Sequence, residues 1–256
     1  MARVKLAMIA AMTMANGIGK DAGLPWKLKG EMAYFRKVTT HVPSVLGDEG
    51  GESSTAAGKR RNAVIMGRKT WASIPPKFRP LKDRLNIVIS RTSSEAELGI
   101  DAASSDVKLC KSLESAYELL RQGTDSDLIA RVFVIGGAQL YTDLINHTSD
   151  QDGVEVDRLL VTRILGPQYE CDAFFPEFRS QEQLQEDLET THEHANSTID
   201  NTSAIHPLSS TEWTRASTES IKEYLGSSCP ADLADKHRMI VQEDATWYEY
   251  QMWQRK

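Results

Sequence analysis

Short apolar runs that end at glycine or at a small polar residue constrain the fold of this chain more than any other feature. Four such runs, rich in Val and Ile, lie at Val4–Met12, Ala63–Met66, Leu85–Ile89 and Val132–Ile135. Runs of this length without polar alternation are typical of strands buried on both faces. Helical patterns follow two of them, at Arg68–Ile74 and Ala138–Ile145. The alternation predicts an α/β fold with a central, twisted, mostly parallel sheet and flanking helices.

Three further elements extend this prediction along the chain. Ser112 is a candidate N-cap for a helix that runs to Gln122 and has one apolar face. That face comprises Leu113, Ala116, Tyr117 and Leu120. Leu159–Ile164 is another strand-like run, and Trp247–Trp253 alternates between two kinds of side chain. The alternation predicts an antiparallel C-terminal strand at or near the edge of the sheet.

Two segments interrupt this order, at about 43–61 and 180–235. Pro43–Arg61 is rich in Gly, Ser and Ala, which predicts an extended loop. Ser180–Asp235 is polar and acidic with few aliphatic residues, which predicts a long surface insertion that is helical near Gln181–Glu189. No linker separates two cores, so we expect a single domain over residues 1–256 that carries both segments as surface insertions.

The bulk composition excludes several classes of protein. Apolar residues make up 40% of the 256 residues, which is ordinary for a globular chain. No apolar run approaches the roughly 20 residues that span a bilayer. The net charge of −6 argues against general nucleic-acid binding. Met1 to Ala15 fits either a signal peptide or a first buried strand, and the lack of a small-residue cleavage site favours the strand.

Cysteine and histidine usage indicates neither a disulfide framework nor a metal site. The three cysteines, Cys110, Cys171 and Cys229, are far apart and odd in number. His192 and His194 form an HxH pair without evident further ligands, so we expect no metal. A reducing, cytoplasmic compartment fits this cysteine usage. Nothing in the sequence requires more than a monomer.

Positive charge is concentrated in one stretch of the chain. From Lys59 to Arg91 there are ten Lys or Arg residues and one acid, Asp83. From Gln181 to Glu212 there are seven acids and no Lys or Arg. In a mildly acidic protein, this concentration of cations indicates an anionic small ligand, although a solvated basic surface is an equal alternative.

Several predicted strand ends are candidate phosphate-binding positions. Gly67-Arg68-Lys69-Thr70 stands where a strand gives way to a helix, and Ser90-Arg91 ends the next strand. Free backbone N–H groups and the helix dipole favour phosphate there, and the planar guanidinium of Arg suits a nucleotide 2′-phosphate. Gly136-Gly137 lets the backbone approach a pyrophosphate closely. Helix capping, surface charge and a tight turn are the alternatives, and no GxGxxG motif is present.

A glycine-containing loop and a carboxylate in the first helix are the other candidate site features. Asn16–Lys20, followed by Leu24-Pro25-Trp26, indicates either a loop that closes over an active site or a plain connector. Glu31 lies four residues before Phe35, so both share one helix face. A carboxylate beside an apolar wall needs a partner, and it can bind an amidine-like group or carry a proton at a raised pKa. A surface Glu on an amphipathic helix is the alternative.

Together these stretches resemble the dihydrofolate reductase family. Each is weak evidence by itself, but ten of them in the family's order make chance an implausible explanation. The matching stretches are Ile9-Ala10-Ala11, Asn16–Lys20, Leu24-Pro25-Trp26, Glu31–Phe35, Met66–Ile74, Arg79–Arg91, Val132–Tyr141, Leu160–Ile164, Ala173–Phe178 and Tyr248–Trp253. The long insertions depart from a minimal member. Together with Glu at position 31, they favour a eukaryotic and more narrowly a fungal type.

The resemblance implies an activity and a cofactor. The activity is reduction of 7,8-dihydrofolate to 5,6,7,8-tetrahydrofolate, with hydride transfer from NADPH to the pterin C6 and protonation at N5. Glu31 would hydrogen-bond the pterin and help to deliver the proton, Thr162 would support Glu31, and Trp26 is the third catalytic candidate. Antifolates would bind as inhibitors. The product would serve one-carbon metabolism and the synthesis of thymidylate and purines.

The resemblance also assigns residues to the two ligands. The implied substrate-binding residues are Ile9, Ala10, Glu31, Phe35, Ile74, Leu81, Arg84, Ile135, Tyr141 and Thr162. Arg84 would pair with the α-carboxylate of the glutamate tail, in a bidentate geometry that Arg suits and Lys does not. The implied NADPH-binding residues are Ala11, Ile18, Gly19, Gly67, Arg68, Lys69, Thr70, Ser90, Arg91, Lys111, Gly136, Gly137, Ala138, Gln139, Leu140 and Tyr141. Among them, Ser90 and Arg91 would contact the 2′-phosphate.

Two other functions remain as alternatives at this point. One is a related pyridine-nucleotide reductase that acts on another heterocycle, such as a pyrimidine intermediate of flavin synthesis. Glu31 and Arg84 together favour folate, because one suits an amidine-like ring edge and the other a carboxylate tail. The second alternative is a non-catalytic nucleotide-binding module. The intact Glu31 and the intact Gly17–Gly19 loop argue against it.

Overall fold

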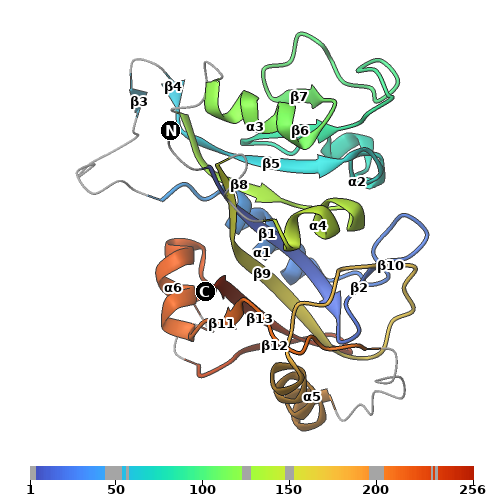
Figure 1. Cartoon of the computed structure of the whole chain (residues 1–256), viewed down its shortest axis with the longest axis vertical. Coiled ribbons are helices and arrows are strands. Elements are labelled where there is room, and N and C mark those ends of the chain that lie inside the picture. The colour runs from blue at the N-terminus through green and yellow to red at the C-terminus, as the bar shows by residue number, and fades with distance from the viewer. Residues whose placement is uncertain are drawn as a thin grey trace.

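The computed structural model describes residues 4–43, 54–55, 58–122, 128–147, 153–195, 205–231, 233 and 236–256. Its centre is a nine-stranded sheet in the order β11-β13-β9-β1-β8-β5-β6-β7, with β12 also paired to β13 (Figure 1). These strands are β1 (Val4–Thr13), β5 (Arg61–Gly67), β6 (Arg84–Ile89), β7 (Val107–Cys110), β8 (Ile129–Val134), β9 (Val154–Gly166), β11 (Trp213–Arg215), β12 (Met239–Glu243) and β13 (Thr246–Arg255). Two short pairs lie outside it, β2 (Gly17–Gly19) with β10 (Ala173–Phe174) and β3 (Ser54–Thr55) with β4 (Gly58–Lys59).

The strands from β9 to β7 in this order are parallel, which confirms the predicted mostly parallel sheet. Their apolar runs are buried on both faces, and Val64, Ile65, Ile87, Val88 and Phe133 have no exposed surface. Runs without polar alternation fold this way because each face of the sheet is covered. The short strand β7 was not predicted from the sequence.

Helices cover both faces of the sheet. They are α1 (Lys29–Thr40), α2 (Arg68–Ser73), α3 (Leu113–Gln122), α4 (Ala138–Ile145), α5 (Gln181–Ala195) and α6 (Thr218–Leu225), with short 3₁₀ turns η1 (Pro76–Phe78) and η4 (Gly226–Ser228). One hydrophobic cluster joins α3 and α4 to one face, and a second joins α1, α2 and α6 to the other. Figure 1 shows α3 and α4 in front of the sheet and α1 behind it. The predicted cap of α3 is confirmed, since the Ser115 N–H donates to Ser112 Oγ at 3.2 Å.

The chain crosses the sheet in opposite directions after β1 and after β8. From β1 it passes through α1 on one face to β5, and from β8 it passes through α4 on the other face to β9. Because β1 and β8 are direct neighbours, the two connections diverge at the carboxyl ends of these strands. Ligands of open α/β sheets bind at such a point.

The C-terminal strand β13 is antiparallel, as predicted, but it lies one position in from the edge of the sheet. It pairs with β9 on one side and with β11 and β12 on the other. Its polar side chains Glu249 and Gln251 are only 1% and 2% exposed. The alternating pattern of this strand therefore reflects two different buried environments, not one buried face and one solvated face.

Most of the described residues in the predicted surface insertion at 180–235 are exposed or partly exposed, and α5 confirms the helix expected near Gln181–Glu189, but part of the segment is buried against the sheet. Asp187 of α5 is fully buried. It accepts hydrogen bonds from Arg179 Nη1 at 2.9 Å, Arg215 Nη1 at 3.1 Å and Gln251 Nε2 at 3.0 Å. Arg163 Nε of β9 lies 3.7 Å from the same carboxylate. A buried carboxylate requires such partners, and these come from separate parts of the chain, so the composition of the segment alone could not reveal them.

The rest of this segment covers the opposite face of the same sheet edge. Ile221 and Leu225 of α6 are buried in the cluster that contains α1. Ser228 Oγ of η4 donates to the Lys37 carbonyl at 3.3 Å, which joins the segment to α1. Of the first predicted insertion, residues 44–53 and 56–57 lie outside the described part, and β3 and β4 form an antiparallel pair.

Candidate active site

Glu31 is buried at the start of α1 and faces the sheet. It is 6% exposed, and Thr162 Oγ1 donates to its Oε1 at 3.4 Å. Thr162 lies on β9 between Ala11 of β1 and Tyr250 of β13. Burial raises the pKa of Glu31 to about 7, with Glu243 adding to the rise and the Thr162 hydrogen bond opposing it. The alternative of a surface Glu is therefore wrong, and this carboxyl group titrates near neutral pH.

One face of α1 carries Glu31, Phe35 and Thr39 at successive i+4 positions. Over these eight residues a helix rises by about 12 Å. At the far end of the row, Arg84 Nη1 of β6 donates to Thr39 Oγ1 at 2.7 Å. The row therefore places a carboxyl group and a guanidinium group about 12 Å apart along the helix axis, with an aromatic ring between them.

Arg84 is a buried cation whose hydrogen bonds go to uncharged groups. Arg84 is only 4% exposed, and its Nε donates to the Lys82 carbonyl oxygen at 2.9 Å. Burial and the charge of Arg36 lower the pKa of Arg84 to about 10, while Asp83 opposes this effect. The guanidinium is still charged at neutral pH, and a desolvated cation with neutral partners favours an anionic ligand.

Most of the predicted apolar substrate residues lie on the same side of the sheet as Glu31. Ile9 is buried in the cluster that contains α1, and the partly buried side chains packed against that cluster include Phe35, Ile74, Leu81 and Ile135. Ala10 differs, because the alternation along β1 turns its side chain to the cluster on the opposite face. The structure therefore does not bring the Ala10 side chain to the predicted wall.

Trp26 is buried in the same cluster as Ile9. Its ring packs edge-to-face against Tyr169, with 5.5 Å between the ring centroids. The indole N–H has no hydrogen-bond partner among the described residues, so it is a buried donor that a ligand can satisfy. A pocket of about 410 Å³ opens beside it, lined by Leu24, Trp26, Lys27, Leu28, Lys29 and Met32.

The loop that follows β1 is joined to the segment that follows β9. Its strand β2 pairs with β10, and the Gly17 N–H donates to Thr13 Oγ1 at 2.9 Å. A Cβ atom on Gly17 would collide with the Cys171 side chain. Close packing therefore explains the glycine at this position, where the sequence suggested a hinge. Ile18 is partly buried against the cluster on the side of α4.

Gly136 and Gly137 join the end of β8 to the start of α4, next to the end of β5. The Gly67 N–H donates to the Gly136 carbonyl at 2.8 Å, and a Cβ atom on Gly137 would lie 3.2 Å from Thr70 Oγ1. Gly136 has a φ of 115°, which residues with a side chain rarely adopt. Gly67, Thr70 and the two glycines therefore form one backbone surface at the N-terminus of α4, where free N–H groups favour an anion.

The first three residues of α4 and the adjacent Tyr141 have different environments. Ala138 is partly exposed and Gln139 is exposed, with its Nε2 donating to Asp143 Oδ1 at 2.8 Å. Leu140 and Tyr141 are buried, and Tyr141 Oη donates to the Ile9 carbonyl at 2.7 Å. The structure thus brings Tyr141 to β1, and Leu140 Cδ1 lies 3.9 Å from the position that a Cβ atom on Gly67 would take.

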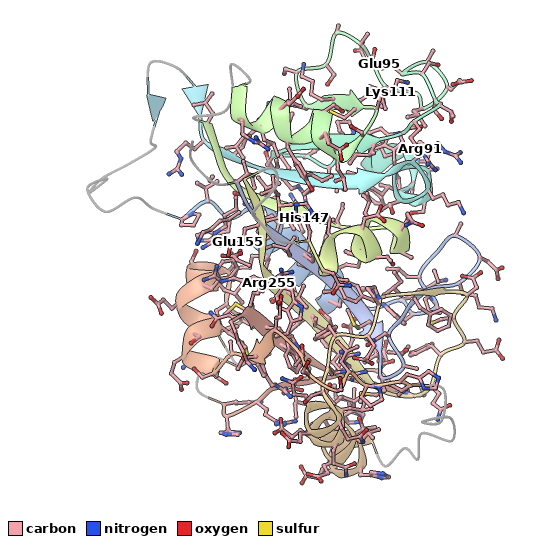
Figure 2. All side chains as sticks on the ribbon, in the orientation of Figure 1. Arg91, Glu95, Lys111, His147, Glu155 and Arg255 are labelled. Carbon is pink, nitrogen blue, oxygen red and sulfur yellow. The ribbon has the colours of Figure 1, made fainter. Side chains whose placement is uncertain are left out.

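Three neighbouring strand ends carry the predicted basic residues. Register pairs Gly67 of β5 with Ile89 of β6, and Ile89 with Cys110 of β7, so these strands end side by side. The exposed cations that follow them are Arg68 and Lys69, Arg91, and Lys111. Figure 2 shows Arg91 and Lys111 at the same end of the molecule. The β5, β6 and β7 ends therefore form one cationic edge, which continues from the glycine surface at β8.

Ser90 and Lys111 also hold the local backbone at this edge. Ser90 is buried, and its Oγ accepts from the Ser93 N–H at 3.0 Å. Lys111 Nζ donates to the Ser93 carbonyl at 2.8 Å. Both contacts order the turn after Arg91, whose side chain is exposed.

Comparison with known proteins agrees with this geometry. A family model described as dihydrofolate reductase matches residues 5–62 and 56–206. The chain is 34% identical over 259 residues to the dihydrofolate reductase of Cryptococcus neoformans, covering 96% of this chain and 92% of that one. It is 36% identical over 254 residues to that of Pneumocystis carinii, covering 98% and 96%.

This chain belongs to the dihydrofolate reductase family. The solved structure of the Schistosoma mansoni dihydrofolate reductase matches it with a TM-score of 0.61 at 26% identity, over 100% of both chains. The two sequence relatives named above are fungal, in agreement with the type that Glu31 and the long insertions favoured.

Two residues of the site in this family member were not predicted from the sequence. Thr39 binds Arg84, and its position eight residues after Glu31 on one helix face is a signal that could have found it. Tyr169 packs on Trp26, and no local pattern indicates it, because it follows β9 far along the chain.

Two further features of the described residues bear on this family member. They include no group of three or more His, Cys, Asp or Glu side chains placed to hold a metal ion. None of the helices within the described ranges combines the length and apolar character that crossing a bilayer requires.

Proposed function

We propose that this chain reduces 7,8-dihydrofolate to 5,6,7,8-tetrahydrofolate with NADPH as the hydride donor. The observation that carries the proposal is the row on α1 that leads from buried Glu31 past Phe35 to Arg84. Glu31 suits the amidine-like edge of a pterin, and Arg84 suits the carboxylate tail at the other end of the same ligand. A heterocycle without a carboxylate tail would leave the buried Arg84 unpaired, which makes the rival reductase reaction less favourable.

The residues of the cationic edge fit NADPH. Gly67, Gly136 and Gly137 leave room for a pyrophosphate next to free N–H groups, and a side chain on Gly137 would meet Thr70. Arg68 and Lys69 are exposed beside that surface. Ser90 and Arg91 lie at the end of the next strand, β6, where the guanidinium of Arg91 can bind the 2′-phosphate. Ala11, Ile18, Gly19 and Tyr141 are the proposed neighbours of the nicotinamide.

The mechanism assigns separate tasks to the chain's own residues. When bound, NADPH supplies the hydride that reduces the pterin at C6. Glu31 binds the pterin and holds the proton that is delivered to N5, which its buried position allows near neutral pH. Thr162 orients the Glu31 carboxyl group through Oε1. Trp26 and the apolar wall exclude bulk water from the site. The substrate is therefore held next to the Glu31 carboxyl group in surroundings that favour the protonated form of that group.

A spectrophotometric assay tests this function. Oxidation of NADPH should depend on added dihydrofolate and should stop when an antifolate is added, because the inhibitor would occupy the α1 row. Oxidation that depends on a pyrimidine substrate instead would support the rival reductase. Tight NADPH binding with no oxidation of it by either substrate would support a non-catalytic nucleotide-binding module.

Arg84→Leu is expected to raise the KM for dihydrofolate about 10- to 100-fold, since one charge-assisted interaction contributes about 1.5–3 kcal/mol. The KM for NADPH should change little, because the cationic edge is formed by other residues. Arg84→Lys should give an intermediate KM, as Lys retains the charge and loses the planar fork. Steady-state kinetics with each substrate varied would check this, and an equal loss for both substrates would contradict the assignment.

Arg91→Gln is expected to raise the KM for NADPH about tenfold and to leave the KM for NADH almost unchanged, because NADH lacks the 2′-phosphate. Because the side chain of Arg91 is exposed, its substitution should change stability by less than about 0.5 kcal/mol, so a change in KM reports on binding of the cofactor. Lys77→Gln, which removes an exposed cation that lies over the Phe78 ring instead, is the matched control. A parallel rise for NADPH and NADH would show that Arg91 does not read the 2′-phosphate.

We further propose a single domain that acts as a monomer in the cytoplasm. One sheet connects α1, the cationic edge and the 180–235 segment, so one copy of the chain supplies both ligand sites. Cys110 and Cys171 form no disulfide, which suits a reducing compartment. Light scattering of the purified chain would test the oligomeric state.

A further inference from the structure

The helix that carries Glu31 has no cap from its own sequence. Its N-cap residue is Leu28, whose side chain makes no capping hydrogen bond. The first N–H groups of any helix lack partners within the helix. In this chain Glu243 of β12 supplies them, with Oε1 accepting from the Lys29 N–H and Oε2 from the Gly30 N–H at 3.0 Å. The cap is thus 214 positions from Lys29 in the sequence.

The position of Glu243 is fixed from two sides. Tyr248 Oη of β13 donates to Glu243 Oε2 at 3.1 Å, and the β12–β13 pairing places Glu243 opposite Thr246. Gly30 leaves room for this arrangement, because a Cβ atom there would lie 2.9 Å from Glu243 Oε2 and 3.1 Å from Tyr248 Oη. The residue next to Glu31 therefore has to be small for the carboxylate of Glu243 to reach the helix.

This cap changes which hydrogen-bond donors the Glu31 carboxyl group can bind. A Glu at the third position of a helix can reach back to the N–H of the N-cap residue, which is Leu28 here, and the positive end of the helix dipole favours its ionised form. Here the N–H groups of Lys29 and Gly30 already bind Glu243, and Glu31 accepts from Thr162 instead. The charge of Glu243 also disfavours ionised Glu31, which adds to the effect of burial on its pKa.

Among the described residues, the other titratable groups that interact electrostatically with Glu31 are tyrosines on three elements: Tyr34 of α1, Tyr248 and Tyr250 of β13, and Tyr141 of α4 on the other side of the sheet. Burial raises the pKa of all four, so they are neutral around pH 7. Lys29 lies two positions earlier on the helix and is exposed to solvent. A substitution of Glu243 therefore removes one negative charge that acts on Glu31 and leaves the neutral tyrosines around Glu31 unchanged.

We propose that Glu243 is a positioning residue for the reaction: by binding the Lys29 and Gly30 N–H groups at the start of α1, it directs Glu31 toward Thr162 and places a second carboxylate at the same end of the helix. The inference rests on the proposed role of Glu31 as the proton carrier. It assigns a function to the β12–β13 hairpin, which contributes no other residue to the proposed proton transfer.

The direct test is a titration of the Glu31 carboxyl by ¹³C NMR on the full chain, with the signal assigned by its loss in Glu31→Gln. Glu243→Gln keeps the side-chain size and a hydrogen-bond acceptor, and it should lower the Glu31 midpoint by about 0.5–1 pH unit. Glu243→Asp keeps the charge and should retain most of the wild-type midpoint. Asp244→Asn removes the same charge from the next, exposed residue of the hairpin turn, and should leave the midpoint unchanged.

Single-turnover rates of dihydrofolate reduction give a second readout. Wild type and Glu243→Gln should agree near pH 5, where Glu31 is protonated in both, and at pH 8 the variant should be about three- to tenfold slower. The difference should vanish in the Glu31→Gln background. An unchanged Glu31 midpoint in Glu243→Gln, or an equal shift in Asp244→Asn, would overturn the proposal. The NMR titration needs no turnover, so it decides the role of Glu243 even if the proposed function fails.

Discussion

Glu31→Gln is expected to lower the single-turnover rate of dihydrofolate reduction about 10²- to 10⁴-fold at pH 7, the contribution of a well-placed general acid. Glutamine keeps the size of the side chain and can accept the hydrogen bond from Thr162, but it has no proton to deliver. NADPH affinity should change little, because the cationic edge formed by Arg68, Arg91 and Lys111 lies on other strands. A wild-type rate in the variant would contradict the role of Glu31.

Stability of the same variant is the control that separates a lost proton from a damaged fold. In the wild type, the pKa of Glu31 rises from 4.5 to about 7 on folding, so the unfolded chain releases this proton first as the pH increases. The free energy of unfolding should therefore fall between about pH 4.5 and pH 7, by about 3 kcal/mol in total. Urea unfolding of Glu31→Gln should lack this decline, and the variant should be no less stable than wild type at pH 8.

Asp187→Asn is expected to lower the free energy of unfolding by about 3–5 kcal/mol at pH 7, the range found when one partner of a buried ion pair is removed. Asparagine keeps the shape of the side chain, but it leaves the buried Arg163 and Arg179 with less negative charge around them. Glu186→Gln removes an exposed charge from the preceding position of α5 and should change stability by less than about 0.5 kcal/mol. Urea unfolding of the three proteins at one pH would measure both differences.

The pH dependence of the difference in unfolding free energy between wild type and Asp187→Asn identifies the cause of that difference. Burial alone would raise the pKa of Asp187, but Arg163, Arg179 and Arg215 outweigh burial and hold the pKa below its usual value. A carboxyl group with a depressed folded pKa contributes stability above its unfolded pKa of about 3.9, and this contribution is lost as the pH falls further. The gap between wild type and Asp187→Asn should therefore narrow below about pH 4. A gap of constant size would indicate a packing defect instead of a lost charge.

The asparagine variant should also affect the loop that precedes β2. Arg163 Nη1 donates to the Thr13 carbonyl and to Asn16 Oδ1, both at 2.7 Å, and Arg179 Nη2 donates to the Met14 carbonyl at 2.9 Å. The buried cluster around Asp187 thus joins α5 to the loop beside the proposed nicotinamide site. The segment that the composition indicated as solvated is part of what holds that loop.

The sequence by itself determined the parallel strands, the helices that follow them and the residues at the strand ends. These features are local, because burial on both faces requires an unbroken apolar run, and helix periodicity places Glu31 and Phe35 on one face whatever the rest of the chain does. The cationic edge could also be predicted from the sequence, because parallel strands place their carboxyl ends at one side of the sheet.

Only the tertiary structure decided the surroundings of those residues. The partners of Asp187, the hydrogen bond between Thr39 and Arg84, and the cap that Glu243 gives to α1 all join positions that are distant in sequence. The buried position of β13 depended in the same way on β11 and β12. A charged side chain has no preferred place in a sequence pattern, because whether it is solvated or buried depends on which opposite charges and donors the folded chain brings within a few ångströms of it.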